Sequence, residues 1–255
     1  VAINKMDIVD FDETVYEKIK ADYLKFAEQL NVKDIKFVPM SALKGDNVVT
    51  RSEHTPYYTD KPLLELLEDS PAAATDNGFE PRLPVQYVVR PNLDFRGFQG
   101  TITSGQFKVG DAVKVLPSGK ISSVKELVTF NGHLDHAEAG QAITMTLNDE
   151  IDVSRGDVIV PAHSSAQATN QLQAKLVWMH EQPLELGKTY NFKLGTKKTA
   201  AVVSRIDHTI DVNTLEKGQA ESLQLNEIAI VTLELTEPMM ADIYRDNRET
   251  GAFIL

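Results

Sequence analysis

The stretch Val1-Ala2-Ile3-Asn4-Lys5-Met6-Asp7 opens the chain and joins a short apolar strand to an Asn-Lys-x-Asp tetrapeptide. The ionised side chain of Asp7 offers two acceptor oxygens, which match two hydrogen-bond donors lying side by side. Guanine presents such a pair in its ring N1–H and its 2-amino group, whereas adenine lacks both donors. A site built around such bonds discriminates against analogues without them by about 10⁴- to 10⁵-fold. The tetrapeptide therefore predicts a purine-specificity site, in which Asn4 ties down the loop and the aliphatic stem of Lys5 lies on the base.

The residues that follow have the order of a β-α-β unit. Apolar residues from Val15 to Leu30 recur at spacings of three and four, which predicts an amphipathic helix. Residues 35–40 predict a strand that runs into Ser41-Ala42-Leu43-Lys44-Gly45, and this loop resembles the GTPase loop whose backbone N–H groups meet the guanine oxygen. Open parallel sheets bind ligands at the carboxyl ends of their strands. We therefore expect both loops to form one guanine-binding site, made of Asn4, Lys5, Asp7, Ser41, Ala42 and Leu43.

The motifs that bind phosphates and magnesium in GTPases are missing from the sequence. There is no Gly-x-x-x-x-Gly-Lys-Ser/Thr loop, and no Asp-x-x-Gly run follows a strand where it could approach Mg²⁺ and the γ-phosphate. We therefore predict no catalytic and no metal-binding residue in this chain, and no GTP hydrolysis by the chain alone. The chain also begins and ends inside strand-like runs, which predicts a piece of a longer protein truncated at both ends.

Acidic residues outnumber basic ones, with 37 Asp and Glu against 26 Lys and Arg. Residues 1–84 hold 16 acidic and 10 basic side chains (net −6), and the remainder holds 21 and 16 (net −5). Because binding to a phosphate backbone depends mainly on Lys and Arg, nucleic acid is not expected as the main partner. The absence of cysteine, of a signal peptide and of any apolar run of about 18 residues indicates a cytoplasmic protein with no membrane span.

Composition and periodicity predict the domain organisation. Residues 1–70 form the α/β part, the carboxyl-terminal portion of a GTPase domain, and residues 71–84 have the composition of a linker. Short β-rich runs then predict two small antiparallel barrels at residues 85–165 and 170–255. The expected strands are 85–90, 100–104, 112–116, 124–130, 142–147 and 157–160 in the first barrel, and 174–179, 189–194, 199–208 and 227–235 in the second.

A guanine-reading α/β part followed by two β-barrels resembles the translation-factor family of GTPases, and many segments favour one branch of it. The chain is similar to the GTPase subunits of bacterial ATP sulfurylase (sulfate adenylyltransferase). The similar segments are Phe95-Arg96-Gly97-Phe98-Gln99-Gly100, Ser104-Gly105, Val109-Gly110-Asp111, Val115-Leu116-Pro117-Ser118-Gly119, Val128-Thr129-Phe130, Asp152-Val153-Ser154-Arg155-Gly156-Asp157, Trp178-Met179, Pro183-Leu184, Ile210-Asp211-Val212-Asn213-Thr214 and Asn247-Arg248-x-Thr250-Gly251-x-Phe253-Ile254. Each segment is short, but their order and number cover nearly the whole chain.

The resemblance implies a function that the residues alone do not. Such subunits bind and hydrolyse GTP, with Mg²⁺ expected in the complete protein, and drive sulfate activation by a separate adenylylating subunit. That reaction converts ATP and sulfate into adenosine 5′-phosphosulfate and pyrophosphate during sulfate assimilation. Only the six base-reading residues carry over to this sequence, with GTP or GDP as the ligand. Two alternatives stay open: an elongation-factor-type GTPase that binds tRNA, and a non-catalytic β-barrel module that docks a partner enzyme.

Three histidines lie where a ligand role is worth weighing. His133 and His136 flank Leu134-Asp135 in a polar loop without a third ligand nearby, which favours solvated histidines over a metal site. His54 lies beside the predicted base site, within the polar stretch 51–60. For His54 the sequence favours a flexible polar loop.

Overall fold

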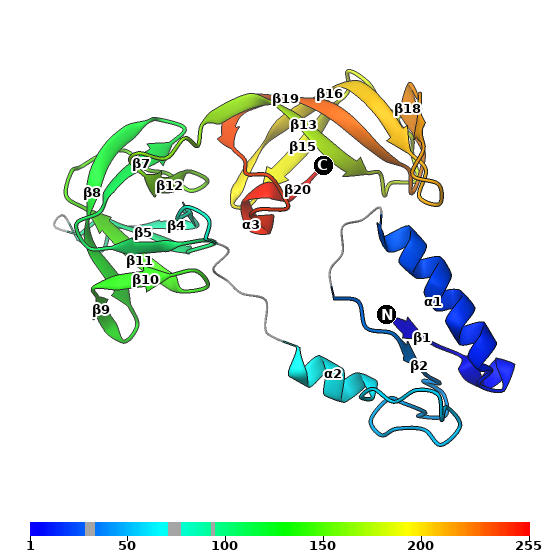
Figure 1. Cartoon of the computed structure of the whole chain (residues 1–255). Helices are drawn as coiled ribbons and strands as arrows, with labels where there is room; N and C mark the ends of the chain where they lie inside the picture. The colour runs from blue at the N-terminus through cyan, green and yellow to red at the C-terminus, as the bar shows by residue number, and fades with distance from the viewer. Residues whose placement is uncertain (29–33, 71–77, 93–94) are drawn as a thin grey trace. The chain divides into compact units, whose positions relative to one another are not determined.

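The computed structural model describes residues 1–28, 34–70, 78–92 and 95–255. The chain divides into two compact units, Val1–Ala74 and Thr75–Leu255 (Figure 1). Of the predicted linker 71–84, residues 71–77 lie outside the described residues, and Leu83–Pro84 form a strand of the second unit. Among those that are described, no helix combines the length and the apolar character needed to cross a bilayer.

The first unit is built on two short parallel strands. In β1 (Ala2–Ile3) and β2 (Val38–Pro39), Ala2 pairs with Val38. The predicted strand 35–40 shortens to two residues because β1 offers only two partners in register. The other elements are the 3₁₀ helix η1 (Met6–Val9), α1 (Glu13–Ala27) and α2 (Leu63–Asp69).

A side-chain cap and a small apolar core position α1. The Asp12 carboxylate accepts a hydrogen bond from Val15 N–H at 3.0 Å, which satisfies a backbone donor that has no partner inside the helix. Tyr16 is buried against a core made of Ile3, Met6, Phe11 and Phe37. Position 30, where the sequence places the helix end, lies outside the described residues.

The first part of the second unit is an eight-stranded sheet with its own core. Seven of its strands follow the order β3-β12-β7-β8-β11-β5-β4, and β9 pairs with β8. These strands are β3 (Leu83–Pro84), β4 (Tyr87–Val89), β5 (Gly97–Thr101), β7 (Ala112–Leu116), β8 (Lys120–Thr129), β9 (Gly132–Leu134), β11 (Ala142–Leu147) and β12 (Val158–Pro161). A separate pair, β6 (Gln106–Lys108) and β10 (His136–Glu138), was not predicted. Alternate residues such as Val113 and Val115 are buried, as period-two patterning requires.

A second sheet of six strands follows (Figure 1). It has a separate apolar core that includes Phe192 and Leu233. Five strands follow the order β13-β19-β16-β15-β20, and β17 pairs with β16. The elements are β13 (Ala168–Val177), β14 (Leu184–Glu185), β15 (Thr189–Leu194), β16 (Lys197–Ile210), β17 (Lys217–Gly218), β18 (Ser222–Leu223), β19 (Ile228–Met240), α3 (Arg248–Gly251) and β20 (Phe253–Ile254). β14 and β18 form a two-stranded sheet of their own.

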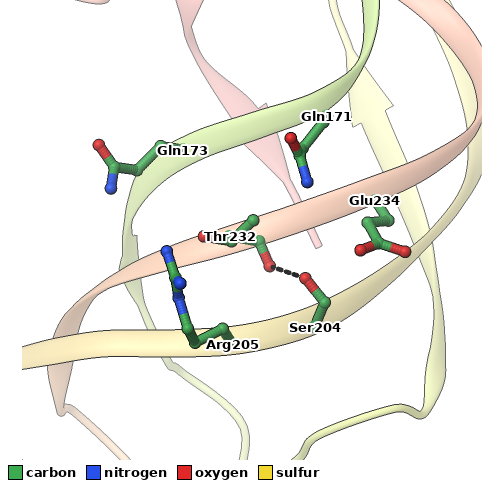
Figure 2. Close-up of a pocket in the computed structure, with 6 residues that line it drawn as sticks. All are labelled: Gln171, Gln173, Ser204, Arg205, Thr232 and Glu234. Atoms are coloured by element: carbon green, nitrogen blue, oxygen red, sulfur yellow. Dashed lines mark hydrogen bonds between the residues drawn. The ribbon is translucent and has the colours of Figure 1, made fainter.

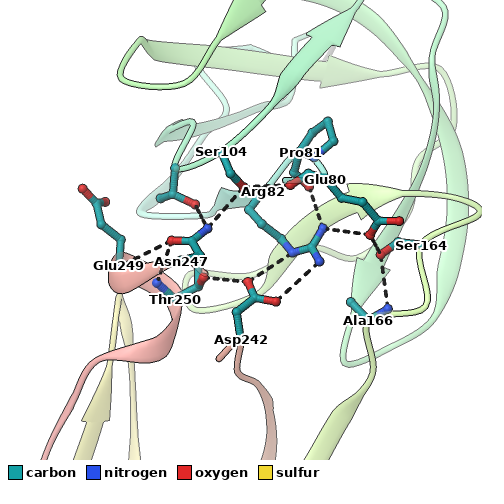
Figure 3. Close-up of polar contacts among 11 residues, drawn as sticks. Glu80, Pro81, Arg82, Ser104, Ser164, Ala166, Asp242, Asn247, Glu249 and Thr250 are labelled. Carbon is teal, nitrogen blue, oxygen red and sulfur yellow. Dashed lines mark hydrogen bonds and ion pairs between the residues drawn. The ribbon is translucent and has the colours of Figure 1, made fainter. Parts of the chain in front are cut away.

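Buried polar contacts join these two parts of the second unit (Figure 3). Arg82 is 3% exposed, and it donates from Nε to Asp242 Oδ2 at 3.2 Å and from Nη2 to Oδ1 at 3.4 Å. Thr250 Oγ1 donates to the same Asp242 Oδ2 at 2.6 Å. Asn247 caps α3 and donates from Nδ2 to Ser104 Oγ at 3.2 Å. These directional bonds hold the carboxyl-terminal residues against the start of the first sheet.

Candidate functional site

The Asn-Lys-x-Asp tetrapeptide turns sharply as it leaves β1. Lys5 has a left-handed φ of 65°, and Asn4 Oδ1 accepts the Lys5 N–H at 2.7 Å. Met6 is 1% exposed, and its N–H donates to Met40 O at 3.1 Å. This buried anchor lies between the two polar side chains, so Lys5 stays exposed and Asp7 half-buried in the first turn of η1.

The second loop is a closed turn after β2. Ser41 is fully buried, its N–H donates to Asp46 O at 3.2 Å, and its carbonyl accepts Gly45 N–H at 2.8 Å. Ser41 Oγ accepts the Lys44 N–H at 3.2 Å. Gly45 has φ 85°, a conformation that residues with a Cβ rarely adopt. The turn therefore presents residues 42–44 at the surface while Ser41 holds it from inside.

One hydrogen bond joins the two loops directly. Asn4 Oδ1 accepts the Ala42 N–H at 3.0 Å, across 38 positions of sequence. The Ala42 donor is therefore occupied, whereas the Leu43 N–H has no partner among the described residues. Leu43 is 89% exposed. The structure thus brings Asn4 and Ala42 into contact and leaves Leu43 as the accessible backbone donor of the second loop.

A third segment, which the sequence did not assign to the site, supports the second loop. Asp46 Oδ1 accepts Ser52 Oγ at 2.6 Å and contacts His54 Nδ1 at 2.9 Å. The Ser52 hydroxyl, followed by His54, lowers the pKa of Asp46 below its ordinary value. The His54 ring also stacks on Phe11, with ring centroids 5.0 Å apart. His54 therefore makes two specific contacts, although its side chain is 65% exposed.

Buried polar groups tie this same segment to both strand ends. Asn47 is 1% exposed, and its Nδ2 donates to Pro39 O and to Thr55 Oγ1, both at 2.8 Å. Tyr57 donates its hydroxyl to Phe11 O at 2.9 Å. The segment thereby contacts β2, which leads into the second loop, and also the residue that follows η1. The residues that make these contacts, Asn47, Ser52, Thr55 and Tyr57, are irregularly spaced after Gly45, so no local sequence pattern identifies them.

A polar groove in the second unit is a separate candidate surface (Figure 2). It encloses about 550 Å³ of open space between β13, β19 and β16, and it is lined by Gln171, Gln173, Ser204, Arg205, Thr232 and Glu234. β16 bulges between Val203 and Arg205, and Ser204 Oγ donates to Thr232 O at 3.3 Å. Arg205 is ion-paired with Asp207 through its Nε. The groove is open and polar, and Gln173, Ser204 and Arg205 are already paired with protein groups, so we assign no function to it.

No cluster of metal ligands accompanies these surfaces. Across residues 1–28, 34–70, 78–92 and 95–255, no three His, Asp or Glu side chains gather closely enough to hold an ion. His133 approaches only Glu126, with Nδ1 and Oε2 3.9 Å apart.

Comparison with known proteins gives relatives over the whole chain. All 255 residues match "Sulfate adenylyltransferase subunit 1" of Alteromonas mediterranea at 54% identity and of Teredinibacter turnerae at 53%. The same named subunit of Shewanella oneidensis is 53% identical over 260 aligned positions. In each case the match covers 100% of this chain and 54% of the relative. The chain therefore spans about half the length of these curated relatives.

Fold-level comparisons agree with the predicted fold class. Residues 171–255 match the family model described as GTP-eEF1A C-terminal domain-like. Sup35 complexed with GMPPNP superposes with a TM-score of 0.63 at 21% identity, over 99% of this chain and 64% of Sup35. Translation elongation factor SelB from Methanococcus maripaludis, in its apo form, gives 0.55 at 22% identity, over 95% of this chain and 52% of SelB. At such identities these structures show a shared fold, which is the elongation-factor-like architecture expected from the sequence.

Proposed function

Because the chain is homologous over its whole length to the sulfate adenylyltransferase subunit 1 proteins, we propose that it forms the guanine-reading and β-barrel part of such a subunit. The complete subunit binds GTP and couples its hydrolysis to the formation of adenosine 5′-phosphosulfate from ATP and sulfate. The names of the relatives favour this function over tRNA delivery. The acidic balance of the chain, with a formal net charge of −11, supports the same choice.

The observation that carries the proposal is the contact between the two loops. Asn4 Oδ1 holds the Ala42 N–H at 3.0 Å, and both loops leave the carboxyl ends of paired parallel strands. In this arrangement the Asp7 carboxylate accepts the guanine N1–H and 2-amino donors. The stem of Lys5 covers one face of the base, and the free Leu43 N–H meets the 6-oxo group. Asn4 acts on both loops at once, since one oxygen holds Lys5 N–H and Ala42 N–H.

Phosphate chemistry is assigned to other parts of the complete subunit. The 255 residues contain no phosphate-binding glycine-rich loop, and the described residues hold no cluster suited to a metal. Mg²⁺ and the residues that position the attacking water therefore have no assignment here. The chain alone is expected to leave GTP unhydrolysed while it retains the residues that choose guanine.

Exchange of Asp7 for Asn tests the guanine assignment in the complete subunit. Asp7→Asn replaces an acceptor by a side chain that also donates, so it loses two charge-assisted bonds to guanine. At about 1.5–3 kcal/mol for each bond, GDP affinity falls by about 10²- to 10⁴-fold. The amide donor suits the 2-oxo group of xanthine, so binding of xanthosine diphosphate rises.

Asp10→Asn is the matched control, because Asp10 is an exposed aspartate three positions away with a left-handed φ of 48° that Asn tolerates. Its affinities for GDP and xanthosine diphosphate should stay at the wild-type values. Equal effects of Asp7→Asn and Asp10→Asn, or an unchanged preference for GDP over xanthosine diphosphate, contradict the assignment. Isothermal titration calorimetry measures both ligands on each variant.

The proposed partner is the adenylylating subunit of the same enzyme. A tagged complete subunit mixed with equal amounts of purified adenylylating subunit and tRNA should retain the protein and release the tRNA at 150 mM salt. Retention of tRNA, with a steep loss of binding as salt rises, would instead indicate a translation-factor role.

A further inference from the structure

Asp46 is a largely buried carboxylate at the closing position of the second base loop, with its side chain 10% exposed. Its backbone carbonyl accepts the Ser41 N–H, so Asp46 and Ser41 form the base of the turn. The Oδ2 atom of Asp46 is buried without a hydrogen-bond partner among the described residues. A buried acceptor without a partner costs free energy, so its presence calls for a compensating role.

The other carboxylate oxygen holds two donors from the neighbouring segment. Ser52 Oγ lies 2.6 Å from Asp46 Oδ1, and His54 Nδ1 lies 2.9 Å from it. Ser52 is itself fixed, because its N–H donates to Asn47 Oδ1 at 2.7 Å and its Oγ accepts the His54 N–H at 3.1 Å. Two hydrogen bonds therefore orient the side chain of Asp46, and its main chain closes the turn.

His54 extends this support to the first base loop. Its ring stacks on Phe11, which has a left-handed φ of 56° and follows η1. One imidazole therefore contacts the ends of both loops: Asp46 through Nδ1 and Phe11 through its face. Backbone donors position a ligand oxygen well only when the loop that carries them is held rigidly.

We propose that Asp46, Ser52 and His54 are positioning residues that hold the Ser41–Lys44 turn so that its free backbone N–H reads the 6-oxo group of guanine. This inference rests on the proposed guanine-binding function. It assigns recognition of the base to two protein groups: Asp7 reads the N1–H and the 2-amino group, and the Ser41–Lys44 turn reads the 6-oxo oxygen. Loss of the contacts among Asp46, Ser52 and His54 should therefore weaken only the recognition of the 6-oxo oxygen.

Binding of three nucleotides to the complete subunit distinguishes recognition by Asp7 from recognition by the turn. 6-Thio-GDP keeps the N1–H and the 2-amino group but replaces the oxygen by sulfur, a weak acceptor. Inosine diphosphate keeps the oxygen but lacks the 2-amino group. For each variant, the ratio of the affinities for GDP and 6-thio-GDP measures the contribution of the turn. The ratio of the affinities for GDP and inosine diphosphate measures the contribution of Asp7.

His54→Phe keeps a ring on Phe11 and removes the donor to Asp46, and Ser52→Ala removes the other donor. The bond that each variant should weaken is the neutral one from the Leu43 N–H to the 6-oxo oxygen of guanine. Such a bond contributes about 0.5–1.5 kcal/mol, so each variant should shrink the preference for GDP over 6-thio-GDP by about 2- to 12-fold. The preference for GDP over inosine diphosphate should stay unchanged. His54→Asn, which restores a donor, should recover part of the lost preference.

Ser70→Ala is the matched control, because Ser70 lies in the same unit and its hydroxyl donates to Leu66 O at the end of α2. Both ratios should keep their wild-type values in this variant. A merely structural effect of His54→Phe would weaken all three nucleotides by one common factor, and that result overturns the inference alone. A wild-type subunit that binds GDP no more tightly than ADP overturns the proposed function and the inference together.

Discussion

Removal of the Asp242 side chain should strongly destabilise the second unit, because it takes away the buried carboxylate that pairs with the buried Arg82 guanidinium and leaves only the half-exposed Glu80 to balance that charge. The Arg82 guanidinium is 3% exposed, and Asp242 accepts from both its Nε and its Nη2. In Asp242→Ala these two donors and the Thr250 hydroxyl lose their acceptor at once. The remaining Arg82 contacts are Pro81 O at 3.0 Å and Glu80 Oε2 at 3.3 Å.

Breaking a buried ion pair by removing one partner costs about 3–5 kcal/mol of unfolding free energy. For a unit of this size each kcal/mol corresponds to about 2–4 °C in melting temperature, so we expect a decrease of about 6–20 °C. Differential scanning calorimetry of the chain gives this directly, and hydrogen exchange assigns the transition to the second unit.

Glu185→Ala is the matched control for this experiment. Glu185 pairs with Lys188 at 2.7 Å, but the two side chains are 64% and 47% exposed, and such pairs contribute about 0–1 kcal/mol. The melting temperature should therefore change by only a few degrees. If Asp242→Ala shifts the transition no further than Glu185→Ala, the buried ion pair does not stabilise the junction and the reasoning from burial is wrong.

Three further predictions concern single contacts. Gly100→Ala should cost about 3 kcal/mol or more, because a Cβ there would collide with the Pro84 backbone oxygen, whereas Gly119→Ala meets open space and should cost about 1–2 kcal/mol through its φ of +73°; urea unfolding compares them. A hydrogen bond from the Ser164 hydroxyl, with a smaller effect of Arg82, lowers the pKa of Glu80. The Glu80 carboxylate therefore stabilises the fold above its unfolded pKa of about 4.3, and this stability is lost as the pH falls through the lower pKa of the folded state. Ser164→Ala should raise that pKa in a carboxyl NMR titration. Burial raises the pKa of Tyr58 to about 12, so the first unit should lose stability as pH rises from about 10 to about 12, and Tyr58→Phe should remove that component.

The sequence predicted the bounds of strands that lie in a wide sheet, and it missed short strands that pair only with another short strand far along the chain. The expected runs 112–116, 142–147 and 189–194 match β7, β11 and β15 to the residue, since alternating burial on a wide sheet leaves a clear pattern. β6 pairs only with β10, and β14 only with β18. Two- or three-residue strands carry too few alternations to be recognised, and only the folded chain shows their partners.

In the candidate site, too, local features were predicted and contacts between distant residues were missed. Asn4, Lys5 and Asp7 form a contiguous motif, so local chemistry predicts a guanine site there. The Asn4 contact with Ala42 spans 38 positions, and its consequence, an occupied Ala42 donor and a free Leu43 donor, has no local signal. Asp46 was also missed, because its role depends on a Ser and a His that return to it from a later turn.

The choice of polar groups at the junction of the second unit has a testable physical rationale. Apolar contacts there, such as Met240 against Val160, are non-directional and hold two sheets together without fixing their orientation. The bidentate Arg82–Asp242 pair has fixed directions and fits one orientation. An Arg82→Met/Asp242→Leu variant removes both charges, so it should regain most of the stability lost in Asp242→Ala. If the pair sets orientation, this double variant should melt near the wild-type temperature yet show broadened or doubled amide NMR signals along β3 and α3. Single, sharp signals there would mean that apolar packing alone selects the arrangement.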